Sequence, residues 1–255
     1  MDACIEIEAL QFGYRGRPTL FKNFELCMHR GEMVGLIGPN GAGKTTLLEL
    51  VQGKLKPSAG SIRVLGVDAS ARSVVERAQI AACLPQKHQS PGAATVYDII
   101  MSGRRPYRSF QGYDASDERV ALDAAERLNV SDWLDRKGSD LSGGEYQRVL
   151  LARVLAQDTP ILLCDEPASS LDPKYVWSTF KLLKDLAHND GVAVLVSIHD
   201  LALAATMCDR LVLIKNGEIC FDGLASNLDD KTLSFAYETS VCSVRTISGT
   251  FFSYG

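Results

Sequence analysis

A glycine-rich loop contains the residues best suited to chemistry, and it fits the phosphate-binding pattern G-x4-G-K-[ST]. It lies between an apolar run at 33–37 and helix-forming residues at 46–52, which is the strand–loop–helix context that this pattern requires. The backbone N–H groups would surround an anion, Lys44 would reach the β- and γ-phosphates of a nucleotide, and the Thr45 hydroxyl would reach Mg²⁺. The predicted contacts are Gly38, Pro39, Asn40, Gly41, Ala42, Gly43, Lys44, Thr45 and Thr46.

A second apolar run, at 161–164, is followed by two acids, Asp165 and Glu166. A strand that ends in an aspartate places the carboxylate at the carboxyl edge of an open α/β sheet, where such sheets bind ligands. We therefore expect Asp165 to hold Mg²⁺, through water, and Glu166 to be the general base for an attacking water. Two acids after an apolar run are common, so this prediction depends on the glycine-rich loop in the same chain.

A second loop, at 141–145, offers a hydroxyl, two glycines and the start of a helix that extends through residue 157. These features suit a second phosphate-binding surface, but only the first loop carries a lysine. A head-to-tail homodimer resolves this, because each nucleotide would lie between the Lys44 loop of one chain and the second loop of its partner. The predicted contacts there are Ser142, Gly143, Gly144 and Glu145.

Two kinds of strand are expected to position these loops. Short runs of alternating apolar and polar residues predict antiparallel strands near the N-terminus, at 5–12, 24–28 and 61–65. Compact apolar runs typical of buried parallel strands lie at 33–37, 161–165, 192–198 and 211–214. Helical stretches lie between or after these runs, as a βαβ architecture requires. Asn216-Gly217 predicts a hairpin turn after the last of them.

The region between residues 86 and 140 has no obvious strand pattern. Ser116 is expected to cap a helix whose first turn holds Asp117 and Glu118. We therefore predict an α/β fold, a P-loop NTPase core with a mixed sheet, an N-terminal antiparallel β-subdomain and an inserted helical subdomain. Within a single domain at 1–255, the predicted parts are 1–86 with 158–223 for the core and β-subdomain, 87–157 for the helical subdomain, and 224–255 for a short C-terminal extension.

Composition and charge argue against several classes of protein. The 27 lysines and arginines against 31 acidic residues give a net charge of −4, which argues against a nucleic-acid partner. No apolar run approaches the roughly 18 residues that span a membrane, and Asp2, Glu6 and Glu8 argue against a signal or transit peptide. The seven cysteines are scattered without a C-x-x-C pair, so we predict a cytosolic protein without a zinc site.

Seven motifs resemble, in kind and in order, those of the ATPase subunit of ATP-binding-cassette (ABC) transporters, and the resemblance covers nearly the whole chain. They are Phe12-Gly13-Tyr14, GPNGAGKTT, Gln86, LSGGE with Gln147-Arg148, LLCDEP, Ser170-Leu171-Asp172 and Ser197-Ile198-His199-Asp200. The resemblance implies that the cofactors are ATP and Mg²⁺, that Tyr14 stacks on adenine and that His199 senses the γ-phosphate. It also implies that Gln86, in the glutamine loop, acts in catalysis and at the metal.

Three residues depart from the commoner pattern of that family. Glu145 replaces a glutamine of the signature, Ala168 replaces a threonine after the proline of the LLCDEP motif, and Ser170 replaces an alanine. Only the first departure affects a predicted contact, which is the contact of residue 145 with the ribose.

A short segment, Ser102-Gly103-Arg104-Arg105-Pro106-Tyr107, by itself predicts a basic, proline-broken surface loop. It resembles a stretch of importer ATPases that serve iron-siderophores, haem, vitamin B12 and some oxyanions, and the short chain after Gly223 suits that group. The resemblance implies an ATPase that energises uptake of a metal chelate through integral membrane permease subunits, with a substrate-binding protein as an indirect partner. The subunit would lie peripherally on the cytoplasmic face of the inner membrane, and this segment would dock a permease helix.

Other functions stay open. One is an ABC ATPase for another cargo, such as an oxyanion or a metal ion, and another is a soluble ABC-type ATPase without a permease. The soluble translation type has two cassettes and the chromosome type has a long coiled-coil insertion, and this chain has neither feature. A third is a protein that binds nucleotide without turnover, which should lack Glu166 or His199, and both are present.

Overall fold

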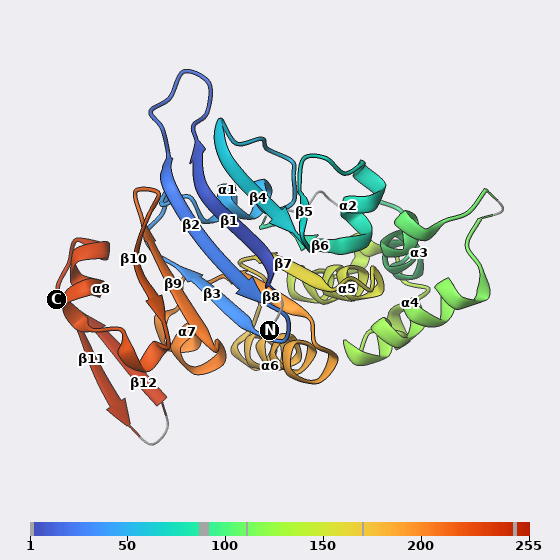
Figure 1. The fold of residues 1–255 in the computed structure, drawn as a ribbon. Coiled ribbons are helices and arrows are strands. Elements are labelled where there is room, and N and C mark those ends of the chain that lie inside the picture. The colour runs from blue at the N-terminus through green and yellow to red at the C-terminus, as the bar shows by residue number, and fades with distance from the viewer. Residues whose placement is uncertain (1–2, 87–91, 111, 170, 247–248) are drawn as a thin grey trace.

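The computed structural model describes residues 3–86, 92–110, 112–169, 171–246 and 249–255 (Figure 1). At its centre is a six-stranded sheet in the order β10-β9-β3-β8-β7-β6. Its strands are β3 (Met33–Ile37), β6 (Ala81–Leu84), β7 (Ile161–Asp165), β8 (Ala193–Ser197), β9 (Arg210–Lys215) and β10 (Glu218–Gly223). Neighbouring strands from β9 to β6 are parallel, and β10 is antiparallel to β9. The predicted α/β core with a mixed sheet is confirmed, and β6 adds a parallel strand that was not predicted.

A four-stranded antiparallel sheet covers one face of the central sheet, and this confirms the predicted N-terminal β-subdomain. In the order β2-β1-β4-β5, its strands are β1 (Ala3–Phe12), β2 (Phe21–His29), β4 (Ala59–Val64) and β5 (Val67–Asp68). The helix α1 (Lys44–Val51) lies between the two sheets, where Ile5, Leu47 and Leu195 share one buried apolar cluster. This packing fixes α1, and with it the glycine-rich loop that precedes it.

Helices cover the other face of the central sheet. The longest is α6 (Pro173–Asp190), and α7 (Leu201–Met207) lies beside it under β3 and β9 (Figure 1). Phe180 and Val194 belong to the apolar cluster on this face. Because both faces are covered, every residue of β3, β7 and β8 is buried, as parallel strands require.

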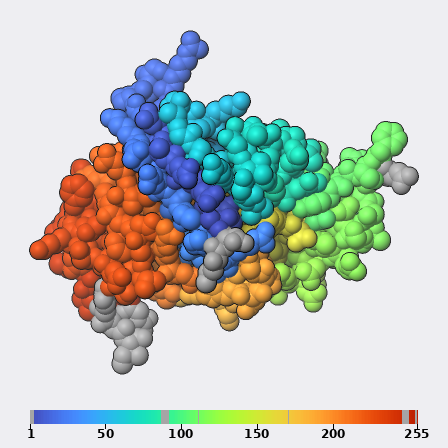
Figure 2. Space-filling view, in the orientation of Figure 1, coloured from blue at the N-terminus to red at the C-terminus, as the bar shows by residue number. Residues whose placement is uncertain are grey.

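The helix α2 (Val74–Ile80) leads into β6. A helical region follows β6 in the chain and extends to one side of the molecule (Figure 1). Its described elements are α3 (Val96–Met101), η1 (Ser102–Tyr107), α4 (Ala115–Arg127), η2 (Ser131–Trp133), η3 (Gly138–Asp140) and α5 (Gly143–Ala156). The C-terminal residues form a small unit at the opposite end of the molecule (Figure 2). This unit contains η4 (Ala225–Asn227), α8 (Asp230–Tyr237), β11 (Val241–Thr246) and β12 (Gly249–Tyr254). None of the helices in the described ranges is both long and apolar enough to cross a membrane.

The N-terminus of α4 differs from the prediction. The N-cap is Asp114 rather than Ser116, since the Asp114 carboxylate accepts hydrogen bonds from the N–H groups of Ser116 and Asp117 at 2.8 and 3.0 Å. In return, the Asp117 carboxylate accepts a bond of 3.2 Å from the N–H of Asp114, which completes a capping box. A carboxylate also interacts more favourably than a hydroxyl with the positive end of the helix dipole. Ser116 therefore lies in the first turn of the helix.

The segment Ser102–Tyr107 is a 3₁₀ helix, η1, rather than a loop. Arg104 is only 7% exposed, because its Nε donates to Asp117 at 2.9 Å and its Nη1 donates to the carbonyl of Ala156 at 2.9 Å. Its guanidinium also lies 4.1 Å from the ring centre of Tyr107. The predicted exposed basic loop is therefore wrong for Arg104. Its partners come from α4 and α5, and local composition does not show that these helices pack against η1.

Candidate nucleotide-binding site

The glycine-rich loop leaves the end of β3 and enters α1, as predicted. Gly38 has a φ of 135°, and a Cβ there would collide with the carbonyl oxygen of Ile214. Gly43 has a φ of 110°, and a Cβ there would lie 2.7 Å from the ring of Phe21. Glycine is therefore required at both positions by the backbone and by close neighbours, and the loop can follow its tight path only without these side chains.

The side chain of Lys44 is held by its own loop. Its ammonium donates hydrogen bonds of 2.6 and 3.0 Å to the carbonyl oxygens of Gly38 and Pro39. Burial lowers the pKa of Lys44 from its ordinary value, and the carboxylates of Glu166 and Asp165 oppose this shift. Two neutral oxygens thus hold the charge beside the cavity, and an anion would be a stronger acceptor than either of them.

Asp165 lies behind Thr45 at the carboxyl edge of the sheet. One carboxylate oxygen accepts a bond of 2.7 Å from the Thr45 hydroxyl, and the other accepts a bond of 2.6 Å from the Ser197 hydroxyl. The same Ser197 oxygen accepts a bond of 2.9 Å from the N–H of Glu166. Ser197 therefore connects the two acids, a role that was not predicted. The predicted strands at 161–165 and 192–198 both end near this edge, but only the structure shows that they are neighbours and that Asp165 pairs with Ser197.

Glu166 and His199 form the edge of the site. The Nε2 atom of His199 lies 2.5 Å from Oε1 of Glu166. Glu166 has a φ of 49°, a left-handed conformation that is uncommon for a residue other than glycine. Two hydrogen bonds hold it, one from its N–H to Ser197 and one of 3.2 Å from the Ser169 N–H to its carbonyl. These contacts fix the backbone of Glu166 in that conformation at the edge of the site.

These residues surround one cavity of about 950 Å³. Tyr14 is 39% exposed at its rim, where its hydroxyl shares a hydrogen bond of 3.1 Å with Thr46 and its ring meets Phe12 edge-on. Gly38, Pro39 and Asp165 lie behind the cavity wall, and Ser142–Glu145 do not line it. The lining residues are Tyr14, Arg17, Pro18, Thr19, Leu20, Asn40, Gly41, Ala42, Gly43, Lys44, Thr45, Thr46, Gln86, Glu166, His199 and Asn216.

A glycine-lined anion loop, the Glu166 carboxylate and an exposed aromatic ring around one cavity, with Asp165 behind its wall, fit a nucleoside triphosphate. The family model for ABC transporters matches residues 21–169, more than half of the chain. The chain belongs to the ABC transporter family. Within that family it is an ATP-binding subunit, as its sequence motifs imply.

Two curated ABC relatives serve different cargoes. The cobalamin import ATP-binding protein BtuD of Halobacterium salinarum is 41% identical over 212 residues, which are 83% of this chain and 53% of that protein. The chain thus spans about half the length of that relative. The phosphonates import ATP-binding protein PhnC of Wolinella succinogenes is 34% identical, over 91% of this chain and 88% of that protein. A solved structure, described as a metal-chelate type ABC transporter in an inward-facing conformation, matches 100% of this chain and 97% of its own with a TM-score of 0.85 and 26% identity.

The signature loop of this ABC subunit leads into α5, and its polar groups form hydrogen bonds with the first turn of that helix. Ser142 is the N-cap, and its hydroxyl accepts a bond of 3.3 Å from the N–H of Glu145. The Glu145 carboxylate accepts a bond of 2.8 Å from the Ser142 N–H and a bond of 3.2 Å from Arg136. These interactions lower the pKa of Glu145 from its ordinary value, the Ser142 N–H first among them. These hydrogen bonds tie the loop to its own helix, and the loop lies apart from the Lys44 cavity of its own chain.

Gln147 of the signature motif and Asp172 of the D-loop do not line this cavity. Gln147, which is buried in α5, donates a bond of 2.9 Å to the carbonyl of Pro167, so the signature helix is attached to the segment after β7. In the predicted D-loop, Ser170 lies outside the described residues, and Asp172 is the N-cap residue of α6.

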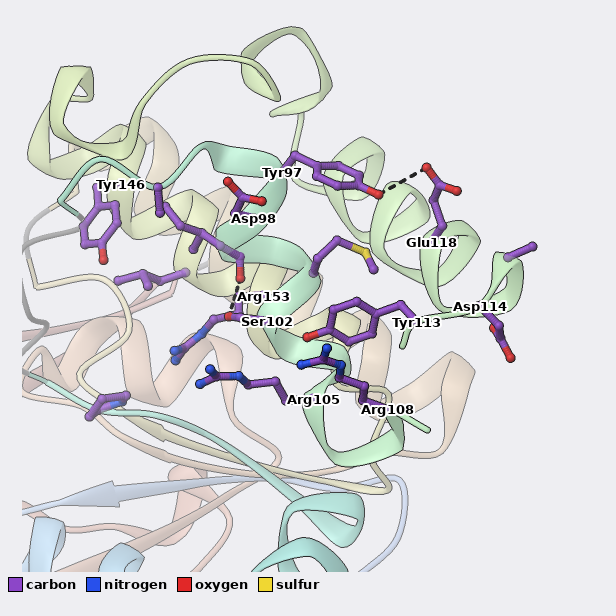
Figure 3. A pocket seen from close by; sticks show the side chains of 16 residues that line it. Tyr97, Asp98, Ser102, Arg105, Arg108, Tyr113, Asp114, Glu118, Tyr146 and Arg153 are labelled. Carbon is purple, nitrogen blue, oxygen red and sulfur yellow. Dashed lines mark hydrogen bonds between the residues drawn. The ribbon is translucent and has the colours of Figure 1, made fainter. Parts of the chain in front are cut away.

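A second cavity, of about 1090 Å³, lies in the helical region, and neither the Lys44 loop nor Glu166 nor His199 lines it (Figure 3). Two of its lining residues adjoin nucleotide motifs, Pro85 before Gln86 and Tyr146 after Glu145. Arg105, Arg108 and Arg153 form its basic side, and Asp98, Asp114 and Glu118 form its acidic side. Tyr113 lies between Arg108 and Asp114, the Tyr97 hydroxyl donates to Glu118 at 3.2 Å, and Tyr146 lies at the end of the cavity away from Asp114 (Figure 3). Arg105 and Arg108 are exposed. Tyr107, predicted to dock a permease, does not line this cavity, since its hydroxyl donates to the carbonyl of Asp158 at 3.1 Å.

Proposed function

We propose that this subunit hydrolyses ATP to energise import of a metal chelate through a membrane permease. The observation that carries the hydrolytic part is the convergence of Lys44, Glu166 and His199 on one cavity. Family membership supports an ATP-binding role, and the intact acid and histidine support turnover rather than binding alone. The relatives support the transport part.

In the proposed reaction, Lys44 holds the β- and γ-phosphates and Glu166 accepts a proton from the attacking water. The water oxygen forms a bond to the γ-phosphorus as the bond to the bridging oxygen breaks, and ADP keeps that electron pair. His199 holds the Glu166 carboxylate through the contact of 2.5 Å, so the base faces the cavity. Catalysis by these residues consists mainly of positioning and stabilisation of charge.

The residues near Thr45 also fit a magnesium ion. A hydroxyl from Thr45, a carboxylate from Asp165 and a side-chain amide from Gln86 offer the hard oxygen donors that Mg²⁺ prefers. Thr45 and Asp165 are already in contact at 2.7 Å, and Gln86 lines the same cavity. When bound, the ion would neutralise phosphate charge. We propose these three residues as its protein contacts.

We propose that the active unit is a head-to-tail homodimer, in which Ser142 acts on the nucleotide of the partner. The position of Ser142 outside its own cavity supports this arrangement. Mixing a Lys44→Ala chain with a Ser142→Ala chain should restore ATPase activity, because each heterodimer keeps one undamaged site. Random pairing predicts recovery of about a quarter of the wild-type sites.

A mixture of Lys44→Ala and Glu166→Gln chains is the matched control for this experiment. Both residues line the same cavity of one chain, so each heterodimer would have two damaged sites and should stay inactive. Cross-linking would verify that heterodimers form in both mixtures. Equal activity in the two mixtures would contradict the composite site.

The cargo class and the cellular location are part of the same proposal. Two comparisons support a metal chelate, the cobalamin importer subunit and the metal-chelate type transporter structure, and both are consistent with the predicted iron-siderophore, haem or cobalamin class. The phosphonate importer subunit favours an oxyanion as the second candidate. Attached to its permease, and indirectly to a substrate-binding protein, the subunit would lie on the cytoplasmic face of the inner membrane.

The second cavity is proposed as the permease docking site. Its opposed basic and acidic sides suit a helix that carries charges of both signs. Replacing Arg105 and Arg108 by glutamate should weaken association with the permease about tenfold or more, because the basic side becomes acidic. Uptake of cobalamin, haem or a ferric siderophore by reconstituted vesicles should fall in parallel, whereas basal ATPase activity should stay within about twofold.

Arg119→Glu is the control for this double variant, since Arg119 is exposed on α4 but does not line the cavity. Normal uptake by the double variant would exclude this cavity as the docking site. In the wild type, uptake of a phosphonate but of none of the three chelates would establish the second candidate instead.

A further inference from the structure

The C-terminal unit reaches the start of the phosphate loop. The backbone N–H of Gly38 donates a hydrogen bond of 3.0 Å to the hydroxyl of Tyr237, a residue 199 positions away at the end of α8. The Tyr237 ring is half-buried. No nucleotide motif includes Tyr237, and the residue does not line the nucleotide cavity. Tyr237 thus contacts the phosphate loop from outside the set of residues that surround the nucleotide.

Gly38 lies between this tyrosine and the lysine of the site, and it meets them through the two peptide groups on either side of its Cα. Its N–H is bound by Tyr237, and its carbonyl oxygen accepts the bond of 2.6 Å from the Lys44 ammonium. On its remaining side, Gly38 lies so close to the carbonyl of Ile214 that it has no room for a Cβ. Gly38 therefore connects α8 to the Lys44 ammonium, so a shift of α8 would change the position of that ammonium.

The helix that carries Tyr237 is firmly attached to the core. Lys215, at the end of β9, donates a bond of 2.7 Å to the carbonyl of Phe235 and pairs with Glu238 at 3.0 Å. The Lys215 ammonium also lies 4.2 Å from the ring centre of Phe235. Leu233 and Ala236 are buried on the inner side of α8. Because β9 also supplies the Ile214 carbonyl, α8 and the phosphate loop are fixed on the same strand end.

We propose that Tyr237 is a positioning residue of the nucleotide site, an inference that rests on the proposed role of the Lys44 loop in ATP binding. When phosphate oxygens replace the Gly38 and Pro39 carbonyls as partners of Lys44, the Gly38 carbonyl loses its donor. The hydrogen bond that the Gly38 N–H donates to the Tyr237 hydroxyl then still holds Gly38, so the loop retains its shape. Without that hydroxyl, the free loop would adopt other conformations and ATP binding would have to select the competent one.

The test is Tyr237→Phe in the full chain, with ATP affinity measured by equilibrium binding of a fluorescent ATP analogue. One neutral hydrogen bond predicts a Kd about three- to tenfold higher. The KM for ATP should rise by the same factor while kcat stays within about twofold, because bound phosphates hold the loop themselves. A residue that only attached the C-terminal unit would lower the melting temperature without this KM-against-kcat split.

Thr239→Val is the matched control. It removes another hydroxyl of the same unit, one that donates to the carbonyl of Gly255 at 2.9 Å and does not contact the loop, so its Kd should equal that of the wild type. Lys215→Met should loosen α8 and raise the Kd in the wild-type chain, but add nothing in the Tyr237→Phe chain. Additive effects of these two substitutions would overturn the proposed route through Tyr237.

The Lys44→Ala chain separates failure of this inference from failure of the proposed site. If Lys44→Ala weakens binding of the analogue and Tyr237→Phe leaves it unchanged, Tyr237 is not a positioning residue although the loop binds ATP. If Lys44→Ala also leaves binding unchanged, the assignment of the loop itself is wrong.

Discussion

Replacing Glu166 by glutamine should lower ATP turnover by about 100-fold or more while ATP binding persists. The amide has the same shape as the carboxylate and can still contact His199. It does not take a proton from water. Because hydrolysis and product release are expected to reopen the dimer, the variant should also accumulate as an ATP-bound, closed dimer. Single-turnover kinetics would measure the chemical step, and size-exclusion chromatography with ATP would measure dimer formation.

Glu126→Gln provides the control for this substitution, since it is the same chemical change at an exposed position of α4, outside the cavity. Its turnover should match that of the wild type. A Glu166→Gln protein that hydrolyses ATP within a few-fold of the wild-type rate would remove Glu166 from the role of general base. Loss of ATP binding in that variant would show instead that the Glu166 carboxylate contributes to ATP binding before hydrolysis.

Lys44→Ala should act earlier in the cycle, with loss of both ATP binding and hydrolysis. The Lys44 ammonium is placed to contact the β- and γ-phosphates before the reaction as well as during it. Hydrogen bonds to charged groups contribute about 1.5–3 kcal/mol, which corresponds to a Kd roughly 10- to 100-fold higher. The fold itself should survive, because burial already lowers the pKa of Lys44 and thus disfavours its charge in the free protein.

Equilibrium binding of the ATP analogue and steady-state hydrolysis would check this prediction. The matched control is Lys54→Ala, which removes an exposed lysine just beyond α1. Unchanged affinity in Lys44→Ala would count against the phosphate cradle. Weakened binding in both variants would indicate a general effect of positive charge rather than a specific contact.

Local patterns predicted most of the core and several of the residues that line the nucleotide cavity. The glycine-rich loop, the four buried parallel strands and the Asn216-Gly217 hairpin each depend on residues that are close in sequence, and the structure has all of them. The motif residues Tyr14, Gln86, Glu166 and His199 meet around one cavity with the Lys44 loop, as their family order implied. Such features are readable because backbone conformation, burial pattern and turn chemistry are set within short segments.

Contacts between distant segments were decided only by the tertiary structure. Ser197 connects Asp165 to Glu166 because β8 lies beside β7 in register, and Arg104 is buried because α4 and α5 both supply partners for it. Tyr237 reaches Gly38 because α8 is fixed at the end of β9. Strand order, register and helix packing determine which side chains meet, and these depend on the whole chain, so hydrophobic periodicity within any one segment does not contain them.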